Sequence, residues 1–450
     1  MAEQVTENNT LKANSIGKAE MIIMSVSAAA PGLCLGGTTG AIMQGTGSAL
    51  TLAFILATLV IVMVGFSYGQ LSVRYNSAGG TYSYIRSVLG PKTGFVSGWV
   101  HNGIGICSGS IGAVFAIYLH ELVPALPMWL CVIILLIPIF IILWNGVEMT
   151  TKVLVCVWVV QMVLLIYPAI KIILLRAGIV ENVWANSVHA AFVPNFGITG
   201  LMLGALVCVY SFVGFECPAY MGEELKGGSK SVRFTIIAGV IAIGLIYVIM
   251  YWLWTAVMLN TDVAAIKDSP TTLADYAMLV GYYEGGILIS LATLVSTIGS
   301  FFGFAATTIR ILYDMGRTGY LPPLFARLNK HQIPHVSLIF YSVVWTGIAI
   351  FGAYVSADAL FTMVALCASI CYVLICISHI KDRWTEKGAG AVFLNKIMPA
   401  VACLILLYMI VSSDLLYLCI AAGWTLCFFI IAQIWDKRRK AKEEQAVTVE

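Results

Sequence analysis

The chain has 450 residues, of which 60% are hydrophobic and only 10% are charged, and its formal net charge is +3. About a quarter of the residues of a soluble protein are charged, so this composition indicates a polytopic α-helical membrane protein and excludes a soluble one. The small net charge argues against nucleic acid as a partner, because such binding needs a concentrated basic face.

Segments of about 20 apolar residues are long enough to cross a bilayer core of about 30 Å. Twelve such segments are predicted, at 19–46, 49–72, 93–119, 128–146, 150–175, 197–225, 231–258, 285–313, 337–356, 358–380, 396–412 and 414–435. Residues 1–18 form a polar N-terminal tail with no cleavable signal peptide, and residues 436–450 form a charged C-terminal tail. The fold class expected is therefore all-α, with twelve transmembrane helices.

The distribution of Lys and Arg predicts the orientation of these helices. When the N-terminus is placed inside, all but three of the 25 Lys and Arg residues fall in inside connections or tails. The three on the outside are Lys171, Arg176 and Lys267. Cytoplasmic loops of membrane proteins are enriched in Lys and Arg, so we expect both termini in the cytoplasm and the chain in the plasma or inner membrane.

Two of the twelve segments are interrupted near mid-membrane. The first contains Pro31 and four glycines between residues 32 and 40, and the sixth contains Gly214, Glu216 and Pro218. A charged carboxylate at that depth costs about 2.5 kcal/mol or more. Two broken helices in corresponding positions of two five-helix halves are typical of an inverted-repeat transporter. We assign the repeats to 19–175 and 197–380, followed by helices 11 and 12 within 381–435.

Broken helices offer a binding site for a small zwitterion. Free N–H groups at a half-helix end attract a carboxylate, and free carbonyls attract an ammonium group or a metal ion. An α-amino acid carries both charges. Cys367, Cys371 and Cys376 lie close together on one predicted helix, but no histidine or carboxylate joins them, so we expect no resident metal site and no cofactor.

Four motifs together resemble the amino acid–polyamine–organocation (APC) permease superfamily, whose members have the LeuT-type fold. The motifs are the glycine-rich break of the first helix, the loop 77–84, the segment 210–216 followed by 222–226, and the end of helix 8 at 314–322 with 325–330. They span residues 20 to 335. Their combination is specific for the superfamily but does not indicate any one substrate. The resemblance implies a 5+5 inverted repeat plus two C-terminal helices.

The resemblance also implies where a substrate binds. Its carboxylate would meet backbone amides between Gly32 and Gly37, and its amino group would meet carbonyls at 25–30 and 210–213. Tyr210 and Phe304 match gating aromatics of arginine–agmatine exchangers, and the Asn102 amide on helix 3 could donate to a polar substrate end. The candidate substrate-binding residues are Ala30, Gly32, Cys34, Gly36, Gly37, Asn102, Tyr210, Ser211, Phe212, Gly214 and Phe304. The usual Gly-Ser/Ala-x-Ile-Gly-x-Gly-Ile pattern of helix 1 is not present, which leaves the details of carboxylate recognition open.

Three residues are candidates for coupling or gating. Glu216 matches the helix 6 carboxylate of the superfamily and either changes protonation as the cavity opens or only accepts N–H bonds from broken backbone. Gln161 stands where many proton-coupled relatives have a lysine and sodium-coupled relatives hold an ion; because glutamine does not titrate, that proton mechanism is not supported. His101 is either functional or a packing histidine. The coupling ion, H⁺ or Na⁺, stays open.

These observations predict a secondary transporter that moves an amino acid or related amine by alternating access. The alternative within transport is an amine/polyamine or amino acid–amine exchanger. A membrane-embedded transferase would need His, Asp or Glu clustered near one membrane face, and the sequence shows no such cluster. The expected partners are the small-molecule substrate and the lipid bilayer, and the oligomeric state is left open.

Overall fold

The computed structural model describes residues 11, 13–176, 192, 197–258, 269 and 271–447, and the part described is helical. The first half contains α1 (Lys18–Ala29), α2 (Pro31–Gly37), α3 (Thr39–Thr46), α4 (Leu50–Arg74), α5 (Gly80–Leu89), α6 (Pro91–Cys107), α7 (Gly109–Leu122), α8 (Met128–Trp144) and α9 (Val147–Arg176). The second contains α11 (Gly197–Phe212), α12 (Cys217–Tyr220), α13 (Gly228–Met258), α14 (Thr272–Leu279), α15 (Tyr283–Arg317), α16 (His335–Tyr354), α17 (Ala357–Asp382), α18 (Ala389–Val392), α19 (Met398–Val411) and α20 (Leu415–Val447).

The lengths of these helices make the chain a multi-pass membrane protein. Ten helices or helix pairs of the described residues are long and apolar enough to cross a membrane. Two shorter apolar helices, α8 and α11, occupy further predicted spans. The polytopic, all-helical class is thus confirmed, whereas the count of twelve and the 5+5 arrangement stay predictions.

The first helix breaks more sharply than its glycines suggest. The interruption lies at Ala30, which has a positive φ of 52° and donates its N–H to the carbonyls of Val26 and Ser27. Residues 31–37, which the sequence reading places inside the break, form α2. Proline is favoured at the first position of a helix because its missing N–H would be unpaired there, so Pro31 starts α2 instead of disordering it.

The second interrupted helix breaks where the sequence predicts. α11 ends at Phe212, and α12 begins at Cys217, with Gly214 between them at a φ of 115°. That backbone conformation is open to glycine and strained for other residues. Gly214 therefore sets the position of the break.

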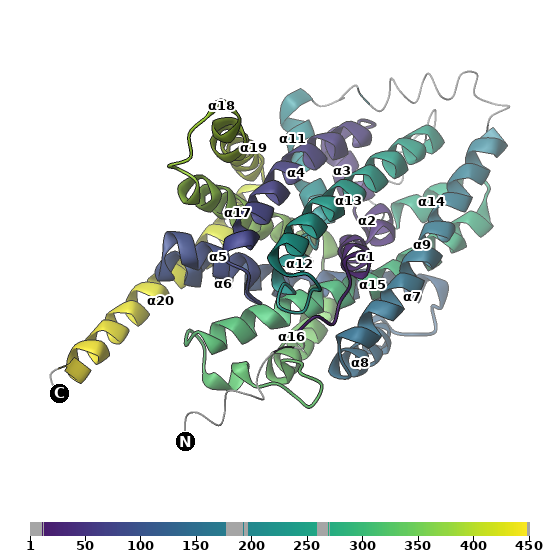
Figure 1. Ribbon diagram of the computed structural model, residues 1–450. Helices are drawn as coiled ribbons and strands as arrows, with labels where there is room; N and C mark the ends of the chain where they lie inside the picture. Colours follow the sequence, from purple (N-terminus) through teal and green to yellow (C-terminus); the bar gives the residue numbers. More distant parts are fainter. Residues whose placement is uncertain are drawn as a thin grey trace.

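Some connections differ from those predicted from the sequence. More than half of the expected loop at 77–84 is helical, because α5 begins at Gly80. The expected third span is divided into α6 and α7 at Ser108, and α20 continues beyond 435 to Val447 and projects from the bundle in Figure 1. Most of the N-terminal tail, the end of the C-terminal tail, and Asp262 and Asp268 of the outer connection lie outside the described residues.

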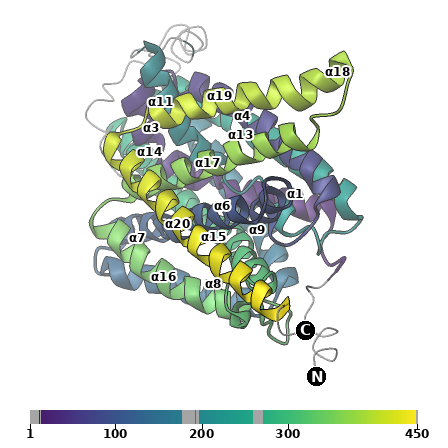
Figure 2. The same cartoon turned by 90° about the vertical axis from the view of Figure 1, so that its left-hand side faces the viewer.

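The interrupted helices lie at the centre of the bundle. α1 and α12 are side by side near the middle of Figure 1, and both also contact α13 and α15. α20 lies across the face that α6 presents in Figure 2. This arrangement surrounds both breaks with protein, which is the condition for irregular backbone at membrane depth.

Candidate functional site

The two breaks meet at Ala28, near the end of α1. A Cβ at Gly214 would lie 2.6 Å from the Ala28 Cβ, and one at Gly303 of α15 would lie closer still. Real Cβ atoms essentially never approach that closely. Gly214 in the second break and Gly303 in α15 therefore allow the first break to lie between the second break and α15.

Side chains cap the free carbonyls at the end of α1. The Ser300 hydroxyl donates to the Ala28 carbonyl at 2.9 Å. The Ala29 carbonyl accepts from the Tyr247 hydroxyl and from the Cys34 thiol, whose Sγ is 3.4 Å away. In this conformation, two of the carbonyls expected to receive a substrate amino group, those of Ala28 and Ala29, are thus held by the protein itself.

The glycines of α2 serve helix packing against α15. A Cβ at Gly32 would lie 2.7 Å from the Ser296 Cβ, and one at Gly36 would overlap Thr293. The Thr293 hydroxyl donates to the Gly32 carbonyl at 3.3 Å. Close packing therefore explains Gly32 and Gly36, and a role for their amides in holding a carboxylate stays a prediction.

Gly37 faces a different environment, at the far end of α2. A Cβ there would meet Val114 of α7 at 3.3 Å. Gly37 lines a cavity of about 360 Å³, whose polar lining includes His120, Glu121 and Asp358. This cavity leads from the surface toward the end of the first interrupted helix.

The Glu216 carboxylate folds back onto its own break. Its Oε2 accepts the Gly214 N–H at 3.0 Å. The Tyr372 hydroxyl of α17 lies 3.4 Å from both carboxylate oxygens. Glu216 is 2% exposed. The carboxylate thus stabilises the broken backbone and ties it to α17, as one of the two sequence interpretations expects; a coupling role is not tested by this geometry.

Several buried polar atoms near the breaks have no hydrogen-bond partner within the described part of the chain. Leaving such an atom unpaired costs about 1–3 kcal/mol. They are the hydroxyls of Ser27, Ser110, Tyr210, Ser211 and Ser296 and both side-chain polar atoms of Gln161. Of these, Tyr210 lies near Ser110 and Ser211 lies near the Cys34 thiol, without full hydrogen-bond geometry. The residues with unpaired atoms come from α1, α7, α11, α15 and α9, the helices that surround the breaks. A ligand or water bound there would satisfy them.

The positions of four of these groups relate them to a break. Ser27 lies three residues before Ala30, and Tyr210 and Ser211 directly precede the turn after α11. Ser296 packs against Gly32. We therefore place the candidate site where the ends of α1 and α11 meet α15.

The predicted gating aromatics are buried side chains. The Tyr210 ring packs against Phe361 of α17, with ring centroids 4.7 Å apart, and Phe212 packs against Tyr247 at 5.7 Å. Phe304 is 5% exposed and follows the glycine that contacts Ala28. Their roles as gates or stacking surfaces stay predictions.

Asn102 and His101 are engaged with other helices. The Asn102 Oδ1 accepts from the Tyr341 hydroxyl of α16 at 2.6 Å, and its amide faces the Met315 sulfur at 3.8 Å. His101 Nδ1 lies 3.1 Å from the Tyr220 hydroxyl. In this conformation the Asn102 amide is occupied by protein, and a substrate contact would require it to exchange partners.

Sequence reasoning missed a buried chain of hydroxyls that ends at His101. Tyr68 of α4 lies 2.5 Å from Thr81 of α5, which lies 2.5 Å from Tyr220 of α12. Tyr220 then reaches His101 of α6. The four residues are far apart in the sequence, so no local sequence pattern predicts this hydrogen-bonded series. It joins the short half-helix α12 to three neighbours.

The paired acids after α12 form ion pairs with cations that the sequence reading did not consider. Glu224 pairs with Arg310 at 2.6 Å, and both side chains are nearly fully buried. Glu223 pairs with Arg317 at 2.8 Å. Lys226, Lys230 and Arg233 are nearer to these acids in the sequence, but the structure pairs the acids with α15, because α15 packs against α12.

The fold and the site define a class of protein: a multi-pass membrane protein with two interrupted helices around a buried polar centre. The chain matches the amino acid permease family over residues 18–431 and belongs to that family. Family membership makes it a membrane transport protein and not an enzyme. In agreement with the superfamily expected from its motifs, its relatives are permeases and antiporters.

Three relatives show the range of the family. An arginine/ornithine antiporter of Latilactobacillus sakei is 23% identical over 84% of this chain and 81% of its own length. The low-affinity putrescine importer PlaP of Escherichia coli K12 is 24% identical over 74% of each chain. The branched-chain amino acid permease BcaP of Bacillus subtilis is 22% identical over 89% of this chain and 88% of its own.

Proposed function

We propose that this permease is a secondary transporter that moves an amino acid or a related amine across the plasma membrane by alternating access. The observation that carries the proposal is the cluster of unpaired buried oxygens at the two breaks, with Ser211 on one interrupted helix and Ser27 on the other. The relatives named above act on arginine and ornithine, on putrescine, and on branched-chain amino acids. An amino group is common to all these compounds.

The two interrupted helices are tied together at one end of the bundle, which supports a gate there. The N–H groups of Ser15 and Ile16 donate to the Glu224 carbonyl at 2.9 and 3.1 Å. The Lys226 N–H donates to the Ile16 carbonyl at 2.9 Å. The buried pair of Glu224 with Arg310 adds a link to α15. Opening this end requires these contacts to break together, and substrate drives the cycle only by favouring one state over another.

The orientation of the gate follows from the proposed topology. In it, twelve helices form two inverted five-helix repeats and a C-terminal pair, and both termini are cytoplasmic. The gate then closes the cytoplasmic side, and the cavity beside Gly37 belongs to the outer side. Exchange of an amino acid for an amine is the alternative to symport, and it uses the same site.

Most of the α15 hydroxyls that could bind a sodium ion already have hydrogen-bond partners in the protein. Ser300 is bonded to the Ala28 carbonyl. The hydroxyls of Thr297, Thr307 and Thr308 bond to carbonyls of their own helix. Ser296 is the candidate of this set with an unpaired oxygen in the described structure. We propose Ser296 and Gln161 as the residues to test for ion coupling, and H⁺ coupling stays the alternative.

A ligand screen on the purified protein tests the proposal. We expect an amino acid or an amine to raise the melting temperature, and the same compound to accumulate in proteoliposomes. Ser211→Ala removes the hydrogen bond that the Ser211 hydroxyl would form with the bound substrate. If that bond contributes about 1.4 kcal/mol, the substrate affinity should fall about tenfold.

Ser378→Ala is the matched control, because this buried hydroxyl donates to the Leu374 carbonyl of its own helix. Its affinity should equal that of the unmodified protein. A screen in which no amino compound stabilises the protein would contradict the proposed substrate class, and equal losses in the two variants would contradict the proposed site.

A further inference from the structure

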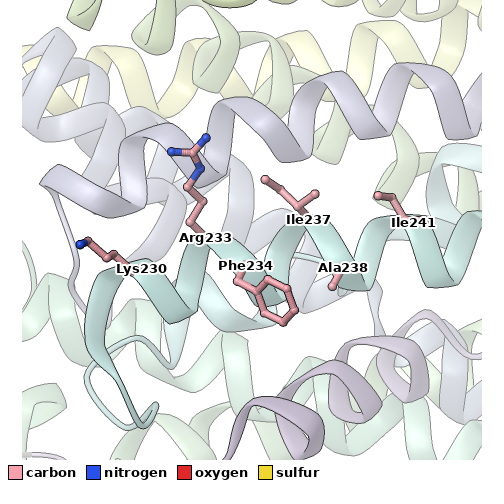
Figure 3. A pocket seen from close by; sticks show the side chains of 6 residues that line it. All are labelled: Lys230, Arg233, Phe234, Ile237, Ala238 and Ile241. Atoms are coloured by element: carbon pink, nitrogen blue, oxygen red, sulfur yellow. The ribbon is translucent and has the colours of Figure 1, made fainter.

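A groove runs along the lipid-facing side of α13, near the helix start. Its volume is about 390 Å³, and we call it the α13 groove; it is lined by Lys230, Arg233, Phe234, Ile237, Ala238 and Ile241. Figure 3 shows the two cationic heads at one end of this row and Ile241 at the other. Residues three and four apart share one face of a helix. The lining is therefore a single stripe, cationic at one end and apolar along the rest.

The cations of the α13 groove are not neutralised by protein. Within the described part of the chain, neither Lys230 nor Arg233 forms an ion pair. The Arg233 guanidinium lies over the Phe66 ring of α4, 5.8 Å from its centroid. A third cation is near, because the Lys18 Nζ is 5.8 Å from the centroid of the Phe234 ring. The charge at this end complements an anion.

The apolar part of the α13 groove is open to the bilayer and is shorter than one leaflet. Phe234 is 56% exposed, and Ile241 is 45% exposed. A helix rises about 1.5 Å per residue, so the apolar part from Phe234 to Ile241 is about 10 Å long. Half of a bilayer core of about 30 Å is about 15 Å. With its cations at headgroup level, the groove thus covers about two thirds of the hydrocarbon depth of one leaflet.

We propose that the α13 groove binds one anionic phospholipid. Its phosphate lies between Lys230 and Arg233, and one acyl chain follows the apolar stripe to Ile241. A zwitterionic lipid fits less well, because its own cationic group opposes the protein charges. Basic pockets between membrane helices are known to hold anionic headgroups. The lipid would contact α13, α4 through Phe66, and the start of α1 through Lys18, and so would touch the first interrupted helix.

The probe is phosphatidylglycerol, mixed in equal amounts with phosphatidylcholine of the same acyl chains and added to the full-length protein in detergent. Native mass spectrometry counts the lipids retained. Each cation near a membrane surface contributes about 1 kcal/mol of attraction. Lys230→Gln combined with Arg233→Gln should therefore lower the preference for phosphatidylglycerol about 30-fold. Ala238→Phe, which fills the groove but keeps both charges, should also reduce retention of phosphatidylglycerol.

The control is Arg327→Gln combined with Lys330→Gln, which removes the same charge from an exposed connection outside the groove. The control should retain phosphatidylglycerol like the unmodified protein. Equal loss in both double variants, or no preference in the unmodified protein, would overturn the proposal. So would binding of free glycerol 3-phosphate with the same dependence on Lys230 and Arg233, which would indicate a site for a soluble anion. A change in oligomer mass without a change in lipid retention would indicate a second copy of the chain.

Discussion

Gly303→Ala tests whether the close approach of α15 to the first break positions the site. Gly303 is helical, and alanine there would ordinarily favour the helix by about 1 kcal/mol. The new Cβ, however, would overlap the Ala28 Cβ and lie 2.8 Å from the Ala28 Cα. Overpacking of this kind costs about 1–3 kcal/mol. Because the helix preference acts in the opposite direction, any net loss of stability must come from the contact with Ala28.

The expected result is a lower melting temperature together with slower uptake by proteoliposomes. Gly347→Ala in α16 is the matched control, since its new Cβ would meet no atom within 4 Å. It should be neutral or slightly stabilising. Both variants place the same methyl group at a helical glycine, so they differ mainly in the neighbour that the methyl group meets.

A double variant isolates the contact itself. Ala28→Gly removes the methyl group that Gly303→Ala overlaps, so the combined variant should recover part of the stability and part of the transport rate. The recovery is partial because the Ala28 Cα remains close to the new Cβ. Neighbouring residues that interact give coupling energies of about 0.5–3 kcal/mol in such cycles. If Gly303→Ala behaved like Gly347→Ala, or if Ala28→Gly gave no recovery, the close-approach argument would be refuted.

Two further variants test the second break and the buried ion pair. Glu216→Gln keeps an oxygen that can accept the Gly214 N–H, so this variant should melt like the unmodified protein. Glu216→Leu leaves that N–H unpaired and should lose about 1–3 kcal/mol of stability. Equal melting temperatures of the two variants would contradict the backbone role of the carboxylate. Glu224→Gln leaves the Arg310 charge buried without its partner and should lower the free energy of unfolding by about 3–5 kcal/mol. Glu224→Met combined with Arg310→Met should lose less stability in thermal melts. A double variant as unstable as the single one would refute this account.

The position of the second interruption could be predicted from local chemistry, but for the first only the region could, because the break lies at Ala30 and residues 31–37 are helical. Gly214 appears in the sequence as a glycine beside a carboxylate and a proline, and its positive φ makes it the break. At the first helix the glycines suggested a long irregular stretch. The structure instead makes Gly32 and Gly36 contact points for α15. A glycine required for packing and one required for a turn look the same in a sequence, because only the neighbouring helix distinguishes them.

The partners of the polar side chains were the least predictable feature. The sequence placed Glu223 and Glu224 near Lys226, but the structure pairs them with Arg317 and Arg310. Likewise, nothing local indicated that His101 ends a chain of hydroxyls through Tyr220. Such pairs depend on which helix ends meet across the bundle.

The sequence by itself determined the membrane class, the permease family and the region in which each of the two helices is interrupted. Long apolar segments are helical in lipid, since a helix satisfies its backbone hydrogen bonds within one segment, and glycine and proline mark where a helix stops. Only the tertiary structure decided that the breaks meet at Ala28, that Glu216 binds its own backbone, and that Ser211 and Ser296 keep unpaired oxygens at the junction. These features depend on contacts between segments far apart in the chain, and hydrophobic pattern and helix propensity contain no information about them.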